Sequence, residues 1–167
     1  LRASEAFMAQ YYLAARVVSQ LAPLLLQSLK TRTYSQIGVT ITPINERFQL
    51  NGTLLEITAP EVFEREPSAI LETFLQFERQ RAVTDIAPQT LRALWNARPH
   101  IDDAFRADPK NKQLFLDLFR EPRGLTRILR RMNQYGVLGR VIPAFGHIVG
   151  RMQHDLFHVY TVDEHTL

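Results

Sequence analysis

Four arginines in one short segment are the first residues whose spacing could serve chemistry. Arg123, Arg127 and Arg130 lie four and three residues apart, and Arg131 follows directly. On a helix this spacing places the first three on one stripe, which could bind phosphates, a nucleotide, RNA or an acidic partner domain. The simpler interpretation is a solvated face beside an apolar face of the same helix.

The charge of the chain is concentrated around these arginines. Residues 120–154 hold seven arginines against one glutamate, a net charge of +6, so the rest of the chain must be net negative to give the whole-chain value of +3. This uneven distribution is the first feature of the chain that could indicate an acidic or phosphorylated partner. Aromatic residues, on which the bases of single-stranded nucleic acids stack, are scarce there, since only Tyr135 is close.

The histidines near the end of the chain are the second candidate. His154 and His158 are four residues apart, so both could reach one metal ion from a helix face. Asp155 follows the first histidine where a zinc-protease motif has glutamate, and no third ligand is evident. We expect structural roles for this pair, and a surface position for His165 when its spacing is considered alone.

The sequence lacks the residues that several classes of function require. The chain has no Cys, which excludes disulfides, thiolate metal sites and a Cys nucleophile. It has no glycine-rich phosphate loop and no Ser in a nucleophile elbow. Its apolar runs are too short to predict a membrane span. With 167 residues and 46% hydrophobic residues, we expect one folded domain without a complete active site.

The elements expected to position these residues begin with a long amphipathic helix over residues 3–31. Pro23 should kink or split it, and its few charges suggest that it packs on two sides. Asn51-Gly52 then predicts a type I′ hairpin with strands at about 45–50 and 53–58. Because a lone hairpin is marginal in water, it should lie against helices.

Prolines at intervals of about ten to twenty residues punctuate the remainder of the chain. Several stand where a proline opens a helix, most clearly at Asp108-Pro109. The predicted helices are 61–65, 68–80, 88–97, 99–107, 110–119, 123–134 and 143–154. The expected fold is therefore mainly α, an irregular bundle of short and medium helices with one small β-hairpin at about 45–58.

Four strings of residues in the chain resemble those of a known protein family. They are NERFQL at 45–50, GLTRILRRMNQYGVLGR at 124–140, PAFG at 143–146 and MQHDLFHVYTVDEHTL at 152–167. The chain closely resembles, over essentially its whole length, the family of bifunctional PII uridylyltransferase/uridylyl-removing enzymes. Glutamine synthetase adenylyltransferases share the helical region, but the string Asp163-Glu164-His165-Thr166 is similar to the uridylyl family.

The resemblance implies a place within a larger, bacterial and cytoplasmic enzyme. Residues 1–160 would form a helical connector between a nucleotidyltransferase domain and an HD phosphohydrolase domain, and 161–167 would begin the latter. The enzyme would transfer UMP from UTP to the PII signal protein, remove it by hydrolysis, use Mg²⁺ or Mn²⁺, and respond to glutamine. His165 would be a metal ligand of the complete HD domain, while the isolated chain would be inert.

The arginine stripe then suggests a contact, and an alternative function. In the connector, Arg123, Arg127 and Arg130 would face the transferase cleft or the PII surface and hold triphosphate or acidic groups. The alternative is a free-standing basic helical module that binds nucleic acid or an acidic partner protein. We favour the connector, for which nucleic acid is not an expected partner.

Overall fold

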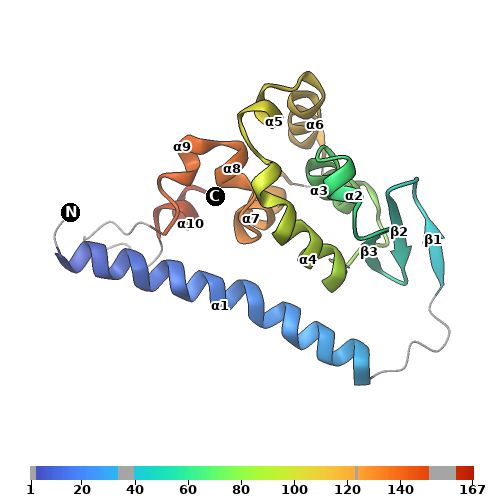
Figure 1. The fold of residues 1–167 in the computed structure, drawn as a ribbon, viewed down its shortest axis with the longest axis horizontal. Coiled ribbons are helices and arrows are strands. Elements are labelled where there is room, and N and C mark those ends of the chain that lie inside the picture. The colour runs from blue at the N-terminus through green and yellow to red at the C-terminus, as the bar shows by residue number, and fades with distance from the viewer. Residues whose placement is uncertain (1–2, 34–39, 123, 151–160) are drawn as a thin grey trace.

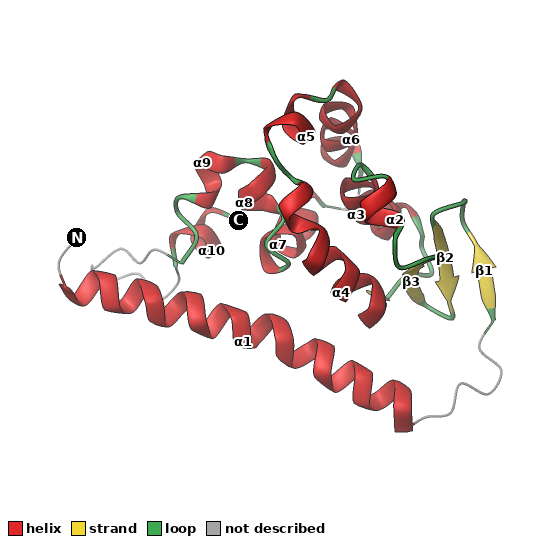
Figure 2. Ribbon diagram, in the orientation of Figure 1, coloured by secondary structure: helices red, strands yellow, loops and turns green. Residues whose placement is uncertain are grey.

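The computed structural model describes residues 3–33, 40–122, 124–150 and 161–167. Helices dominate these ranges, and a small sheet lies at one end of the molecule (Figures 1 and 2). The long helix α1 runs along one side of the rest, with α10 near its first half and α4 near its second half. The predicted fold class, mainly α with a small β element, is confirmed.

Helix α1 (Ala3–Thr33) continues through position 23 without interruption. The predicted split at Pro23 is therefore wrong. A proline inside a helix removes one hydrogen bond and strains the preceding turn, and a helix of about eight turns retains the rest of its ladder. No helix within the described ranges is long and apolar enough to cross a membrane.

Two-sided packing of α1 is also wrong within the described chain. Large apolar residues of this helix are exposed, including Phe7, Val18 and Leu25 at 65–68%. The residues that α1 directs at the rest of the molecule include Arg16 and Gln20, which are polar and hydrogen-bonded. We expected the apolar face of α1 to pack into the core. In the structure this face is exposed to solvent.

The predicted hairpin is present, with a different turn. Strands β2 (Phe48–Asn51) and β3 (Leu54–Ile57) pair antiparallel, and Asn51 pairs with Leu54, so Gly52 and Thr53 form the turn. No described residue other than glycine has a positive φ, and Gly52 has φ 62°. The predicted type I′ turn is therefore wrong. A positive φ at the first central residue alone is the pattern of a type II′ turn.

Two further strands extend this hairpin into a sheet. Strand β1 (Ile41–Pro43) pairs antiparallel with β2, and β4 (Asp85–Ile86) pairs parallel with β3, giving the order β1-β2-β3-β4. Both strands have three residues or fewer. Such strands are too short to show an alternating pattern, which is why the sequence did not predict them.

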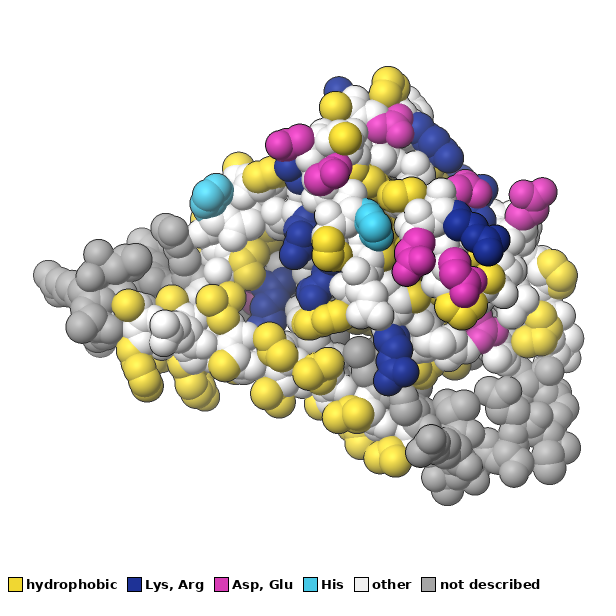
Figure 3. All heavy atoms as spheres, viewed as in Figure 1, with side chains coloured by type: hydrophobic (Ala, Val, Ile, Leu, Met, Phe, Trp, Pro, Cys, Tyr) yellow, Lys and Arg dark blue, Asp and Glu magenta, His cyan; other side chains and the backbone are white. Residues whose placement is uncertain are grey.

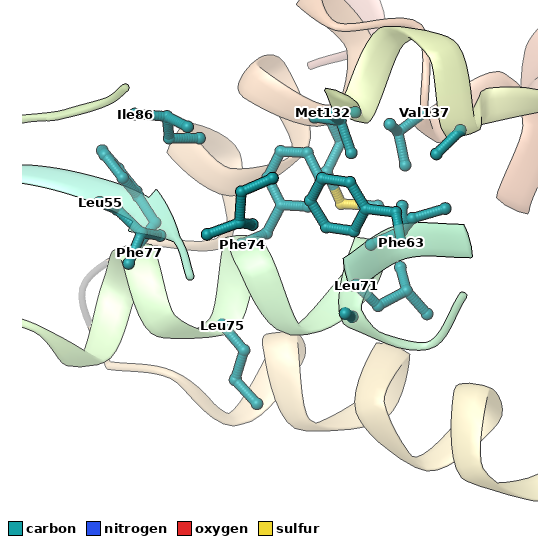
Figure 4. Close-up of a cluster of buried hydrophobic side chains, with 14 of the residues drawn as sticks. Leu55, Phe63, Leu71, Phe74, Leu75, Phe77, Ile86, Met132 and Val137 are labelled. Atoms are coloured by element: carbon teal, nitrogen blue, oxygen red, sulfur yellow. The ribbon is translucent and has the colours of Figure 1, made fainter. Parts of the chain in front are cut away.

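The core forms where the sheet meets α2 (Val62–Arg65), α3 (Ala69–Arg79) and α4 (Pro88–Ala97). Phe48, Leu55 and Ile86 of the sheet are fully buried. Figure 4 shows Phe74 of α3 at the centre of the cluster, between Phe63 and Met132 on one side and Phe77, Leu55 and Ile86 on the other. This continuous core makes the sheet and the central helices one packed unit.

Prolines open helices at two of the predicted places. They occupy the first turn of α4 and of α6 (Pro109–Arg120). The predicted helix 99–107 is instead two elements, the 3₁₀ turn η1 (Arg98–His100) and α5 (Asp103–Ala107). The helix is interrupted at Asp102, which has an extended backbone. Its side chain caps α5 by accepting a hydrogen bond from the Phe105 amide at 2.8 Å.

The last part of the described chain contains short helices around α7 (Leu125–Gln134). They are α8 (Leu138–Val141), α9 (Pro143–Gly146) and α10 (Val162–Thr166). The predicted helix 143–154 is wrong, because α9 ends at Gly146 and Gly150 has φ 71°, a conformation that a right-handed helix does not contain. Residues 151–154 of that prediction lie outside the described ranges.

Asp108 offers a test of local helix stabilisation. Its carboxylate accepts a hydrogen bond from the Lys110 amide at 2.8 Å, at the start of α6. Asp108→Ala should therefore lower the free energy of unfolding by ~1 kcal/mol, measured by urea denaturation. Asp108→Asn, which can still accept the hydrogen bond, should lose less. Equal losses in the two variants would contradict a capping role.

Candidate functional site

The structure describes the positions of two of the predicted contact arginines, and the two have different surroundings. Arg127 of α7 donates to Oε1 of Glu78 at 3.0 Å, and the Glu78 side chain is fully buried. Arg130 is exposed and lines a pocket between α1, α7 and α10. Arg123 lies outside the described residues. Both described arginines are exposed and lie three residues apart on α7, and Arg127 is also paired with a buried carboxylate.

Arg131 makes an ion pair similar to that of Arg127. Its Nη1 lies 2.8 Å from Oδ1 of Asp85, the first residue of β4. The guanidinium groups of Arg131 and Arg127 also lie 4.2 Å and 5.1 Å from the centre of the Phe77 ring. Cations at such distances are attracted to the face of an aromatic ring. These two arginines therefore hold α7 against α3 and β4.

A buried polar cluster surrounds Asp163 of α10. Its Oδ2 accepts from Nη1 of Arg16 and from Nδ2 of Asn133, each at 3.0 Å. Its Oδ1 accepts from the Gly150 amide at 3.1 Å. Asp163 is 2% exposed, so these bonds replace the water that a carboxylate requires. We call Arg16, Asn133 and Asp163 the carboxylate clamp.

The clamp joins three helices that are remote in sequence. Arg16 of α1 also donates to Oδ1 of Asn133 at 2.7 Å and to the Asn133 carbonyl oxygen. One helical turn further along α1, Gln20 donates to the carbonyl oxygen of Gln134, at the end of α7. α1 thus contacts the C-terminal end of α7 through polar bonds, and both helices hold the first turn of α10.

Gly150 completes the clamp from the backbone. Its φ of 71° presents its amide to Asp163. A Cβ at this position would lie 3.0 Å from Cδ2 of Leu13, so α1 also approaches it closely. A side chain here would combine backbone strain with crowding against α1.

The clamp changes the acidity of its carboxyl group. Burial by itself would raise the pKa of Asp163, but hydrogen bonds from Asn133, Gly150 and Thr161 and the charge of Arg16 outweigh it, so the pKa lies below its ordinary value. The ionised form is therefore the one that the fold stabilises. This identifies Asp163 as a structural acceptor that stays charged at neutral pH.

Asp163 should therefore make stability fall in acid. A lowered folded-state pKa means that its contribution is fully present above the unfolded pKa of ~4 and is lost as the pH falls through the folded value. The gap in free energy of unfolding between the unmodified chain and Asp163→Asn should be widest at pH 6–7 and should shrink below about pH 4. Urea denaturation across this range measures it. A gap that does not change with pH would contradict the ionised clamp.

The pocket beside the clamp has a volume of about 480 Å³. Its walls include Tyr12 and Ser19 of α1, Arg130 of α7 and Glu164 of α10. The pocket is therefore open to solvent between cationic and anionic side chains, while Asp163 at its base is committed to the clamp. Of the two predicted contact arginines that the structure describes, Arg130 lines this pocket and Arg127 does not.

The residues that the structure describes do not fit a metal site. They contain no group of three or more His, Cys, Asp or Glu side chains placed to hold an ion. Asp163 is committed to the clamp, and Oε1 of Glu164 accepts from Asn133 at 3.2 Å. His165 belongs to α10, but its side chain lies outside the described part, as do His154 and His158. The ligand role of His165 stays a prediction about a longer protein.

Sequence reasoning missed two members of the clamp. Arg16 is the only charged residue between positions 6 and 29, which is a signal for a buried ion pair in an otherwise uncharged helix. Asn133 gave no comparable signal. Asp163 appeared in the sequence as part of the family string, and its hydrogen bonds to α1 and α7 were not expected.

The described residues form a helical domain with a small sheet, held together by a continuous core and by the ion pairs of α7 and of the clamp. The model of the family described as "Uridylyltransferase GlnD third domain" matches residues 48–141. The chain belongs to this family.

Relatives match almost the whole chain. It is 52% identical over 166 residues to the bifunctional uridylyltransferase/uridylyl-removing enzyme of Chromobacterium violaceum, and 51% and 50% identical to those of Thiobacillus denitrificans and Nitrosospira multiformis. Each match covers 99% of this chain but 19% of the relative, so the chain spans about a fifth of their length. No solved structure matches it.

Proposed function

We propose that the chain is the helical connecting region of a bifunctional enzyme that transfers UMP from UTP to the PII signal protein and removes it by hydrolysis. The observation that carries this proposal is the identity of about 50% over 99% of the chain to proteins with both activities in their names. In this proposal the flanking regions catalyse the two reactions, and the connecting region positions the flanking regions.

The clamp supplies the physical means of positioning. Residues 1–160 would form the connector, and 161–167 would begin the HD hydrolase domain. The first turn of α10 is held by a buried carboxylate with three hydrogen bonds from Arg16, Asn133 and Gly150. His165 lies two residues beyond that carboxylate on the same short helix. The backbone of a candidate ligand is therefore fixed relative to α1 and α7.

A metal ion completes the proposal only in the longer protein. Mg²⁺ or Mn²⁺ bound by His165 and by residues outside this chain would activate water for the removal of UMP. The described residues do not complete such a site, so no catalytic step is assigned to them. Their role is to hold α10 in place.

The remaining partners follow from the same proposal. UTP and PII would be substrates of the flanking transferase, glutamine would be the signal, and the enzyme would act in the bacterial cytoplasm. Within this chain, Arg130 is the described arginine best placed to meet an acidic group, because it is exposed beside the pocket. Arg127 is paired with a buried glutamate and serves packing first.

The direct test assays the full-length polypeptide and residues 1–167 separately, with UTP and PII for transfer and with uridylylated PII for removal. We expect both activities in the full-length protein and neither in the isolated chain, with circular dichroism showing that the isolated chain is helical. Either activity in the isolated chain would contradict the connector. Absence of both activities from the full-length protein would contradict the proposed enzyme.

A further inference from the structure

Helix α1 carries an apolar repeat that the fold does not use. Its positions alternate in spacing by four and three residues. We call them the seam, which consists of Phe7, Tyr11, Ala14, Val18, Leu21 and Leu25. A repeat of alternating four and three residues is the 3.5-residue period by which one helix packs along another with interlocking side chains.

The seam is exposed along its length. Its five large side chains are 41–68% exposed. Figure 3 shows hydrophobic side chains gathered along the outer edge of α1, away from the rest of the molecule. Arg16, which anchors α1 to the clamp, lies about half a turn around the helix from the seam, at 100° per residue. The clamp therefore directs the seam outward.

The composition of α1 shows that this face is unsuited to water. From position 6 to position 29, Arg16 is the only charged residue, and it points into the clamp. Surface helices of folded domains carry charged residues on the solvent face, and long exposed apolar stripes mark contact surfaces. An uncharged face over nearly seven helical turns, ~36 Å long, is therefore a contact surface.

The last residue of the seam also borders a cleft between α1 and the central helices. Leu25 lines an open cleft of about 950 Å³ between α1, α2 and α4, together with Phe63 and Ala93. Arg92, Glu64 and His100 add polar groups to its wall.

We propose that the seam packs against an apolar helix of the same polypeptide, outside residues 1–167. This inference rests on the chain being part of a longer protein, as proposed above, but on neither enzymatic activity. The relatives are about five times as long as this chain, so most of the surface available to α1 belongs to residues that the chain lacks. A partner in the same polypeptide covers the seam at any protein concentration, because its effective concentration is of the order of millimolar.

Cysteine labelling in the native full-length polypeptide tests this proposal. Val18→Cys and Tyr11→Cys each place one thiol in the seam, and residues 1–167 contain no other Cys. Leu26→Cys is the matched control, since Leu26 is 59% exposed against 65% for Val18, and it lies about 100° around the helix from Leu25. Maleimide modification is measured at each site by peptide mass spectrometry and normalised to the denatured protein.

Both seam thiols should react at least about tenfold more slowly than the control, at every protein concentration. Equal rates at the three sites would overturn the proposal. Protection that disappears on dilution, together with a fall in mass from dimer to monomer, would also overturn it and would assign the seam to a second copy. Because labelling does not depend on activity, this result stands apart from any failure of the proposed enzyme.

Discussion

Replacing Phe77 by alanine is expected to lower the free energy of unfolding of the chain by about 4 kcal/mol. Phe77 is 2% exposed in the core between α3, the sheet and α7 (Figure 4). Its loss would leave a cavity and would also remove the ring face beneath Arg131 and Arg127. Urea denaturation followed by circular dichroism measures the loss.

Phe119→Ala is the matched control for this substitution. Phe119 is 48% exposed on α6 and meets Phe115 edge to face at 5.2 Å. Because half of the ring is already in water, its removal should cost ~1 kcal/mol. If the two alanine variants were destabilised equally, the core position of Phe77 would be contradicted.

Removing Arg127 is expected to have the second largest effect, about 3 kcal/mol of unfolding free energy. Oε1 of Glu78 is 3.0 Å from Arg127, and its buried Oε2 has no hydrogen-bond partner among the described residues. Arg127→Ala would therefore leave an uncompensated charge in the core. The cost comes from the orphaned carboxylate rather than from the value of the ion pair.

A second substitution separates these two causes. In the Arg127→Ala background, Glu78→Gln removes the buried charge and should restore about 1 kcal/mol or more, measured as a double-mutant cycle in urea. Arg120→Ala is the surface control, because Arg120 is 68% exposed and pairs with Asp117 one turn away. The free energy of unfolding of Arg120→Ala should stay within about 0.5 kcal/mol of that of the unmodified chain. An Arg127→Ala variant as stable as this control would contradict the buried pair.

Much of the fold could be predicted because its signals are local. Helix 88–97 was predicted with its observed bounds, and Asp108-Pro109 does open a helix, because capping and the fixed φ of proline act over a few residues. Prediction failed where more than one turn type fits the same residues, as in the hairpin. Asn-Gly favours a type I′ turn, but the observed register places Gly52 and Thr53 in the turn.

The candidate site was less predictable, since its contacts join distant segments. Residues Arg16 and Asp163 are 147 positions apart, and no spacing rule connects them. The arginine spacing on α7 placed residues on one helix face, but it did not specify which neighbour that face meets. Arg127 meets Glu78 of α3 because the core packs α7 there, which depends on tertiary structure alone.

The orientation of α1 illustrates the same limit. The apolar spacing along residues 7–25 correctly predicted a helix that carries large apolar residues on one face. It did not show that this face would point away from the described core, because the pattern records a need for burial and not the identity of the partner. The polar clamp decides the orientation, since Arg16 requires Asp163 and lies half a turn from the seam.

The most direct test of the account measures both half-reactions in full-length Arg16→Ala, with Arg120→Ala as the control. If α1 holds α10 through the clamp at the start of the hydrolase domain, removal of UMP should fall by about tenfold or more while transfer stays within about twofold of the unmodified enzyme. The control should change neither activity. Unchanged removal in Arg16→Ala, or an equal loss of both activities, would contradict the account.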